Sequence, residues 1–485
     1  MAGAEPNEPR ARDGIGSTRS SFRSAAVYTF GFAIQRAIGV LMLPLYTRAV
    51  TPAEYGALGV LLAAAAAAVI LFSLGLDIAI FRRYFQLADS PAEQRAFVDS
   101  AWRFLVVFPL VGALLVSGIA WPLVDGQRYV DGIDVLIMLL GAALSVAATT
   151  LPMSILRAEQ ALRKYLILTA VTTLGTPFFT GLFVVVLDEG VRGWLLAMLI
   201  ANGLAMLAAM RVMPWHHGTR FDRRSIREAL RFSLPLLPQS FSHWALQLAD
   251  RTVIAGLVTS ASVGLYSLAA NLASPILTVV VAVHQGLMPV YAKAGVRRGY
   301  DDALRETVVR HIAAVASITL AGCLVGPPML DVIAPSSYYG ASELVPWIML
   351  GYGFLGLYYI PMNGATLMEG RGGFSWVATA FSATLNIGLI LAFVPGHGIK
   401  AAAIASAVGY LALLAGSIVY ARAGARPIPY DWPRIASVLL LAAGVFAAAQ
   451  LVAPADAALR LAVALGWCVV FAAAVLSLRL VPAGP

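Results

Sequence analysis

Gln35 and Arg36 are the first residues of the chain whose types could do chemistry in an unusual setting. They lie near the middle of an apolar stretch from Ala25 to Tyr46, which at roughly 20 residues is long enough to cross a bilayer. Arg36 is about 15 Å from either surface at a rise of about 1.5 Å per residue, too far for its side chain to snorkel. A charge at mid-membrane costs about 2.5–3.5 kcal/mol, so Arg36 is predicted to face protein or a water-filled cavity.

A second polar group lies on a later apolar segment. Gln239, His243, Gln247 and Arg251 recur every four residues, and Asp250 flanks them. This spacing predicts that the four side chains share one helix face. Arg251 is about two turns from the outer end of its helix, so snorkelling remains an alternative for this residue alone. The whole polar face is harder to explain in that way, because an unpaired amide or imidazole is costly in hydrocarbon.

The next apolar segment adds Asn271 and Thr278, with His284 and Gln285 near its cytoplasmic end. A lone histidine such as His284 is more often a structural residue than a ligand. Together with the two segments above, this helix is predicted to line one polar cavity. Its fixed charges are two cations, Arg36 and Arg251, and one anion, Asp250, so we expect the cavity to be more cationic than anionic.

Asp77 is a weaker candidate for the same cavity. It follows Gly75-Leu76 and precedes Arg82-Arg83 by about one turn. A local salt bridge with these arginines is the simpler interpretation of Asp77, and a role in transport is the alternative.

The elements that position these residues follow from composition. The chain is 60% hydrophobic and only 12% charged, with a mean hydropathy of +0.80, far from the composition of soluble proteins. About fourteen apolar runs reach spanning length, and no connecting segment is long enough to fold as a soluble domain. The fold class is therefore all-α and integral to the membrane.

The net charge of +9 reports topology and not a nucleic-acid partner. Most of the 34 Lys and Arg residues fall on the segments that are cytoplasmic if the N-terminus is inside. This bias predicts that both termini are cytoplasmic. Residues 1–23 are predicted to be a disordered cytoplasmic segment without a cleavable signal. Cys323 and Cys468 lie in apolar runs, where packing is their expected role.

Three short motifs recur at an offset of 208 or 209 residues and indicate an internal repeat. Val50–Gly56 is echoed by Val258–Gly264, and Pro152 and Gly190 by Pro361 and Gly398. Six helices per copy make the repeat parallel, with the substrate path between the halves. The predicted parts are an N-lobe at 24–213, a cytoplasmic linker at 214–227, a C-lobe at 228–422 and a final helix pair at 434–481.

Several of these motifs resemble one known family. Pro44–Arg48 followed by Thr51–Gly56 is similar to the first hairpin of the polysaccharide transporter family, the Wzx-type flippases of the multidrug/oligosaccharidyl-lipid/polysaccharide (MOP) exporter superfamily. Gly75–Asp77 with Phe81–Phe85 resembles the end of that family's second helix. Asp250-Arg251 leading to Val263–Ser267 resembles its segment between the seventh and eighth helices. The resemblance covers nearly the whole chain.

The resemblance implies a function. The family flips undecaprenyl-pyrophosphate-linked oligosaccharides across the bacterial inner membrane by alternating access, in polysaccharide biosynthesis. Arg36 would anchor the pyrophosphate with Arg251 second, because guanidinium groups bind phosphate oxygens bidentately. Gln247, His243 and Asn271 would contact sugar hydroxyls. The expected partners are the lipid-linked glycan, membrane lipids and the polysaccharide polymerase and chain-length machinery.

No nucleotide-binding, zinc-binding or hydrolase motif occurs in the sequence. We therefore expect a protein that is not an enzyme and has no cofactor, coupled if at all to a proton or sodium gradient or to the membrane potential. His243 and Asp250 are the candidates for carrying a coupling proton.

Two relatives remain as alternatives. A small-cation or drug exporter of the same superfamily should present mid-membrane carboxylates, whereas the deepest charge here is Arg36. A lipid II flippase would also bind an anionic headgroup, and it remains an alternative. A membrane glycosyltransferase or glycan polymerase would need catalytic acids on a sizeable loop, which this chain lacks.

Overall fold

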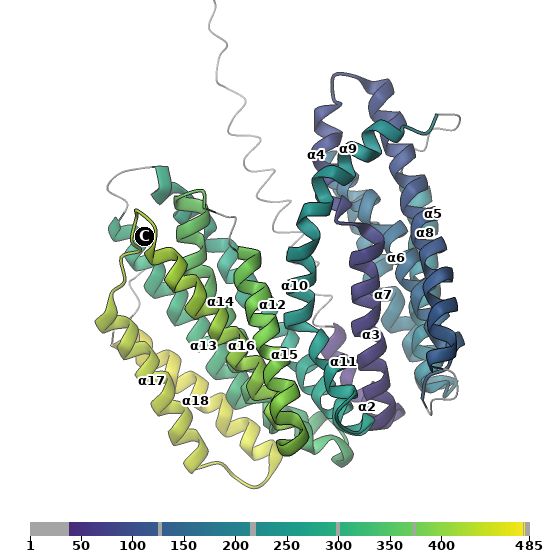
Figure 1. Cartoon of the computed structure of the whole chain (residues 1–485). Helices are drawn as coiled ribbons and strands as arrows, with labels where there is room; N and C mark the ends of the chain where they lie inside the picture. Colours follow the sequence, from purple (N-terminus) through teal and green to yellow (C-terminus); the bar gives the residue numbers. More distant parts are fainter. Residues whose placement is uncertain are drawn as a thin grey trace, which may run out of the picture.

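The computed structural model describes residues 38–124, 129–213, 220–296, 301–371, 375–478 and 480. Gln35, Arg36, residues 1–23 and most of the first predicted helix lie outside these ranges. Within them the chain is helical and contains no β-strand, which confirms the all-α membrane fold class. Figure 1 shows two helical bundles that lie together at one end and diverge toward the other.

The first bundle is built by the N-terminal half of the chain around one apolar core. Its elements are α2 (Leu43–Ala49), α3 (Pro52–Ser73), α4 (Leu76–Gln86), α5 (Pro91–Val124), α6 (Gly132–Ala158), α7 (Leu162–Thr180), the π-helix η1 (Gly181–Val186) and α8 (Gly190–Val212).

The second bundle has a larger core, against which the last two helices pack through a separate apolar cluster. Its elements are α12 (Ser260–Val296), α13 (Asp301–Ile333), the 3₁₀-helix η3 (Ser336–Ala341), α14 (Val345–Asn363), the π-helix η4 (Gly364–Met368), α15 (Ser375–His397), α16 (Ile399–Arg422), α17 (Trp432–Leu451) and α18 (Ala457–Ser477).

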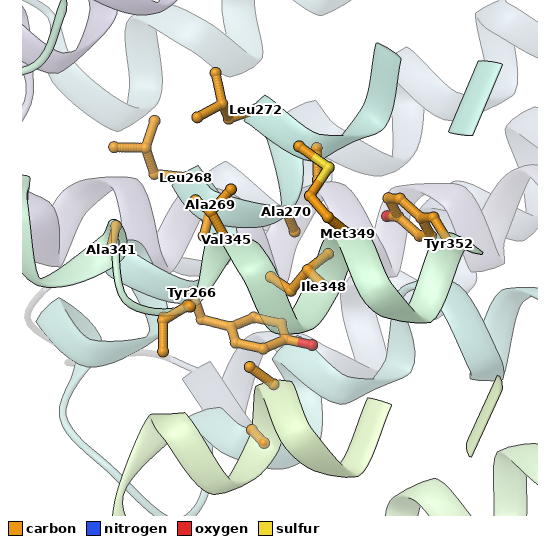
Figure 2. Packing of buried hydrophobic residues seen from close by; sticks show 14 of the residues in the cluster. Tyr266, Leu268, Ala269, Ala270, Leu272, Ala341, Val345, Ile348, Met349 and Tyr352 are labelled. Atoms are coloured by element: carbon orange, nitrogen blue, oxygen red, sulfur yellow. The ribbon is translucent and has the colours of Figure 1, made fainter. Parts of the chain in front are cut away.

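Part of this second core is drawn in Figure 2, where residues of α12 and α14 interdigitate. Leu272 and Met349 are among its apolar members, and both are almost fully buried. Two tyrosines, Tyr266 and Tyr352, lie in the same cluster and carry hydroxyl groups into an otherwise apolar interior. A buried hydroxyl needs a hydrogen-bond partner, and the partner of Tyr266 forms part of the site described below.

The predicted seventh helix is not continuous. The structure divides it into α9 (Arg223–Ser233), the 3₁₀-helix η2 (Leu234–Leu236), α10 (Leu237–Gln247) and α11 (Ala249–Ala255). Pro235 and Pro238 explain the first interruption, because proline cannot donate a helical hydrogen bond. The second falls at Leu248, whose φ of −136° lies outside the helical range. The amphipathic α9 also continues across the predicted boundary between the linker, which ends at 227, and the C-lobe, which begins at 228.

Twelve helices of the described part are long and apolar enough to cross a membrane. The prediction was about fourteen. The difference arises at two places: the first apolar run lies largely outside the described residues, and the seventh is broken into pieces that are individually too short. The protein is a multi-pass membrane protein.

The two bundles meet where α3 and α12 begin, on the side predicted to be periplasmic. Pro52, Ala53 and Gly56 pack here against Ser260 and Gly264, and we call this packing the outer contact. A Cβ on Gly56 would lie 1.9 Å from the Ser260 carbonyl oxygen, and one on Gly264 would lie 1.8 Å from the Pro52 carbonyl oxygen. The Ser260 hydroxyl donates to the Ala53 carbonyl at 2.6 Å. Only glycine permits backbones to approach so closely.

The outer contact has the symmetry that the predicted repeat would produce. Pro52 meets Gly264 and Gly56 meets Ser260, and the offset of 208 residues exchanges these two pairs. A parallel repeat about an axis along the membrane normal would give such a reciprocal contact. The lobe boundaries themselves stay a prediction.

Candidate functional site

Five side chains from three helices form a polar group near the outer contact: Tyr55 on α3, Asp250 and Arg251 on α11, and Tyr266 and Asn271 on α12. We call this group the junction site. Its centre is the short helix α11, which packs against α3, α12, α15 and α16. The break at Leu248 leaves α11 as a separate element and places Asp250 in its first turn. A carboxylate at that position is favourable, because it faces the positive end of the helix dipole.

Asp250 is 4% exposed and is held by neutral donors. Its Oδ1 accepts a hydrogen bond from the Arg251 backbone N–H at 2.7 Å, and its Oδ2 accepts one from the Tyr266 hydroxyl. That hydroxyl is also 3.0 Å from the Ser406 Oγ of α16. These bonds compensate the burial of the carboxylate and tie α11 to α12 and α16.

Arg251 is 6% exposed, so it does not snorkel to the surface. Among the described residues its guanidinium makes no ion pair within 4 Å and no hydrogen bond. A buried cation of this kind is costly unless an anion pairs with it, and a guanidinium suits a carboxylate or a phosphate.

Tyr55 and Asn271 complete the site across the boundary between the bundles. The Asn271 Nδ2 donates to the Tyr55 hydroxyl at 2.9 Å. One turn beyond Tyr55, a Cβ on Gly59 would lie 2.3 Å from the Ser267 hydroxyl oxygen and 3.8 Å from the Arg251 Cδ. The absence of a side chain at Gly59 therefore makes room for the Ser267 side chain of α12 against α3, with Arg251 at ordinary contact distance.

Of the sequence-predicted residues, the structure brings Asp250, Arg251 and Asn271 together. Gln239, His243 and Gln247 lie on α10, half-buried, and α10 packs mainly against α15. Because α10 ends at Gln247, Arg251 does not continue its face, and the predicted single polar stripe is interrupted. The Gln239 Oε1 is buried without a hydrogen-bond partner among the described residues.

The remaining predicted residues lie elsewhere. Asp77 is exposed. Among the described residues it forms no ion pair with Arg82 or Arg83, and Arg83 pairs instead with Glu228 at 2.9 Å. The Thr278 hydroxyl donates to the Ser274 carbonyl of its own helix, and Gln285 is exposed.

His284 belongs to a different polar group inside the second bundle. Its ring stacks on Tyr359 at 3.9 Å, and its Nδ1 is 3.2 Å from the Asn363 amide nitrogen. It lies about 20 Å along α12 from Asn271 at a rise of about 1.5 Å per residue. The structural interpretation of His284 therefore fits its surroundings better than a place in the junction site.

Three buried polar residues were not singled out from the sequence. Tyr266 was seen only as part of a motif, although it bonds to Asp250. Asn386 and Ser382 on α15 are fully buried, and both polar atoms of the Asn386 side chain lack partners among the described residues. An asparagine in an otherwise apolar helix was the available signal, since buried polar groups in membrane spans usually have a role.

Solved structures share this architecture. The lipid II flippase MurJ in an inward closed conformation is 13% identical, with a TM-score of 0.71 over 92% of this chain and 98% of that one. An inward-facing multidrug resistance MATE transporter of the MOP superfamily gives 0.64 at 13% identity, over 83% and 95%. A Vibrio cholerae MATE transporter gives 0.53 at 17% identity, over 84% and 97%. No curated protein matches the sequence significantly.

The protein is thus a helical membrane protein whose fold is similar to those of these flippase and transporter structures. The model of the polysaccharide biosynthesis protein family matches residues 45–339, which is more than half of the chain. The protein belongs to this family, and the resemblance drawn from its first hairpin is confirmed.

Proposed function

We propose that the protein is a flippase that moves an undecaprenyl-pyrophosphate-linked oligosaccharide from the cytoplasmic to the periplasmic leaflet of the bacterial inner membrane. The observation that carries this proposal is Arg251. It is a buried guanidinium that makes no ion pair within 4 Å and no hydrogen bond among the described residues, at the place where the two bundles meet. The pyrophosphate of the carrier lipid supplies the missing partner.

The arrangement of the bundles supports loading from the cytoplasm. The outer contact closes the side predicted to be periplasmic, and the bundles diverge toward the opposite side (Figure 1). In an alternating-access cycle this arrangement receives the headgroup from inside, and separation of α3 from α12 releases it outside. Asn271 and Tyr55, with Gln247 and His243 on the neighbouring α10, offer hydrogen bonds to sugar hydroxyls.

The surface of the second bundle offers room for the lipid chain. Two adjoining grooves of about 390 and 410 Å³ lie between α13, α14, α16 and α17. They share Leu357 and Leu439, and their lining is almost wholly apolar. A polyprenyl chain loses little by leaving bulk lipid for such a groove, so the tail can stay in hydrocarbon while the headgroup crosses.

The cycle is proposed to use a proton or sodium gradient or the membrane potential, which is worth about 2.3 kcal/mol per charge per 100 mV. Asp250 and His243 are the candidates for a coupling proton. Of the two, Asp250 has the better placement, because it links α11 to both α12 and α16 through Tyr266. Flipping in proteoliposomes under imposed gradients tests the coupling, and indifference to every gradient would contradict it.

Arginine variants test the flippase proposal in a deletion strain, with surface glycan and membrane abundance measured together. Arg251→Ala should reduce export by about 10- to 100-fold at normal abundance, because hydrogen bonds to charged groups contribute about 1.5–3 kcal/mol. Arg251→Lys should retain part of it. Arg36→Ala should abolish export, Arg36→Lys should retain part of it and Arg36→Glu should be inactive. Arg48→Ala is the matched control, since Arg48 is an exposed arginine near the outer contact.

Four outcomes test this proposal against its rivals. Normal export by Arg251→Ala and Arg36→Ala would remove the phosphate-anchor assignment. Loss of either variant from the membrane would indicate a structural partner for that arginine. Rescue of a strain that lacks its lipid II flippase would identify lipid II as the substrate class, and drug resistance without glycan export would favour a multidrug exporter.

A further inference from the structure

The segment α9 is an amphipathic helix fixed to the first bundle. Asp222 caps it by accepting a hydrogen bond from the Ser225 N–H at 3.0 Å, and the Asp222 N–H donates to the Ser100 hydroxyl of α5 at 2.8 Å. Arg83 of α4 reaches Glu228 at 2.9 Å and the Ser225 hydroxyl at 3.3 Å. The inner face of α9 is therefore held against α4 and α5.

The opposite face of α9 carries a row of arginines. Arg223, Arg227 and Arg231 follow each other at intervals of four residues and are exposed. They span about 12 Å at a rise of about 1.5 Å per residue. Within the part of the chain that the structure describes, none of the three has an ion pair or a hydrogen bond. Arg224 differs, because it pairs with Glu228 at 3.1 Å.

These three arginines border a groove with an apolar floor. The groove has a volume of about 440 Å³ and lies between α9 and α5. Its apolar lining comprises Phe104, Phe221, Ile226, Leu230 and Leu234. The lining thus combines unpaired cations with apolar side chains in one concave surface.

The groove continues onto the lipid-facing side of α5. Phe104 stacks on Phe108 with ring centroids 5.2 Å apart, and Val107 is 59% exposed in a helix predicted to span the membrane. Phe221 and Leu234 are 42% and 45% exposed, which suits contact with lipid better than contact with water. The groove therefore joins the row of arginines to the apolar surface of a helix that is predicted to span the membrane.

We propose that this groove is a binding site for an anionic phospholipid of the cytoplasmic leaflet, with its phosphate between Arg223, Arg227 and Arg231 and an acyl chain over Phe104. Charge complementarity selects an anionic headgroup. The apolar floor that runs onto α5 selects a lipid over a soluble anion or a nucleic acid. The site is separate from the junction site and does not depend on the proposed function.

The position of the groove gives the bound lipid a mechanical role. α9 continues through η2 directly into α10, which bears His243 and Gln247 and ends at the break before Asp250. A lipid that holds α9 against α5 fixes the start of this broken helix relative to the first bundle.

Native mass spectrometry of the purified full-length protein tests the site, with phosphatidylglycerol and phosphatidylcholine as probes. The wild type should retain phosphatidylglycerol in preference to phosphatidylcholine. If each arginine contributes about fivefold, as basic residues near an anionic surface do, Arg227→Gln weakens phosphatidylglycerol binding about fivefold. Changing Arg223, Arg227 and Arg231 together to Gln should weaken it about 100-fold. Arg224→Gln is the matched control and should change binding less than twofold.

A second measurement separates lipid binding from misfolding. Added phosphatidylglycerol should raise the unfolding temperature of the wild type and of Arg224→Gln, but not that of the triple variant, whose unfolding temperature without lipid should equal that of the wild type. Equal binding by the triple variant and the wild type would overturn the proposal, as would the absence of any preference between the two lipids. Displacement of phosphatidylglycerol by undecaprenyl pyrophosphate at lower concentration would also overturn it, because the groove would then load substrate.

Discussion

Replacing Gly56 by alanine should open the outer contact. The new Cβ would lie 1.9 Å from the Ser260 carbonyl oxygen and 2.9 Å from the Gly264 nitrogen. Real Cβ atoms essentially never approach another atom within 3.0 Å, so α3 and α12 must separate by about 1 Å or more. Both obstructing atoms belong to the backbone, and neither can rotate away as a side chain would.

The energetic effect follows from this geometry. Overpacking a well-packed interface costs about 1–3 kcal/mol, and a clash with two backbone atoms belongs at the upper end. A penalty of about 3 kcal/mol shifts the equilibrium roughly 100-fold away from the state with the outer contact formed. Because alternating conformations commonly differ by only a few kcal/mol, Gly56→Ala should make the state with the outer side closed the minor one.

Spin-label distances between the outer ends of the bundles measure this shift. Leu187→Cys after η1 and His397→Cys at the end of α15 place the labels, in a chain whose two native cysteines have been replaced. Gly56→Ala should move the distance distribution to longer values and reduce glycan export. Gly118→Ala is the matched control, because no atom lies within 4 Å of its Cβ position.

Gly264→Ala should reproduce the effect from the other bundle, since its Cβ would lie 1.8 Å from the Pro52 carbonyl oxygen. The reasoning fails if Gly56→Ala shows the wild-type distance distribution and exports normally. It also fails if Gly118→Ala lengthens the distances as much as Gly56→Ala does.

Three further predictions concern other parts of the chain. Thr259→Cys should be labelled by impermeant thiol reagents from the periplasm and Asp89→Cys only from the cytoplasm; the reverse would overturn the topology. Trp244→Phe removes the bond from the indole N–H to the Ala63 carbonyl at 2.9 Å and should lower the unfolding free energy by about 1 kcal/mol. Denaturant titration in micelles measures this, and an unchanged free energy would show that the bond does not stabilise the fold. Glu369→Gln should reduce stability at pH 7, and the loss should shrink as the pH falls below 4.5, shown by unfolding temperatures measured from pH 7 into acid; a pH-independent loss would contradict it.

The pH dependence at Glu369 follows from its partners just beyond η4. Burial alone would raise the pKa of this carboxyl, but the Arg371 guanidinium and the backbone N–H groups of Arg426 and Ala425 outweigh it and hold the pKa below its ordinary value of 4.5. A carboxyl with a depressed pKa contributes stability that is fully present above 4.5 and is lost as the pH falls through its folded value. Glutamine lacks the charge at every pH, so the variant and the wild type converge in acid.

The helical membrane fold was predictable because apolar runs of spanning length have few alternatives in a bilayer. The break at Leu248 was not predictable, because neither glycine nor proline marks it. There the Asp250 carboxylate accepts the Arg251 N–H, and such local bonds by aspartate compete with the helix ladder. The earlier interruption could have been predicted from Pro235 and Pro238, although it was not.

The site was predicted only in part, for a related reason. Periodicity assigns residues to a face of one helix, but it says nothing about which helices become neighbours. Asn271 lies in the junction site through its bond to Tyr55, whereas His284 on the same helix belongs to another polar group. The bonds of Tyr266 to Asp250 and Ser406 depend on α11, α12 and α16 meeting, which no local pattern encodes.

The outer contact has a consequence for how the protein responds to ionic strength. Its described interactions are backbone packing and the hydrogen bond from the Ser260 hydroxyl to the Ala53 carbonyl, and the bond from the Tyr338 hydroxyl to the nearby Val50 carbonyl also joins neutral groups. Salt screens charges and leaves such contacts nearly unchanged. The opposite ends of the bundles are predicted to be cytoplasmic and to carry most of the Lys and Arg residues, which would approach one another when that side closes in the proposed cycle. Dissolved salt should therefore accelerate closing on the cytoplasmic side and leave opening on the periplasmic side at the same rate.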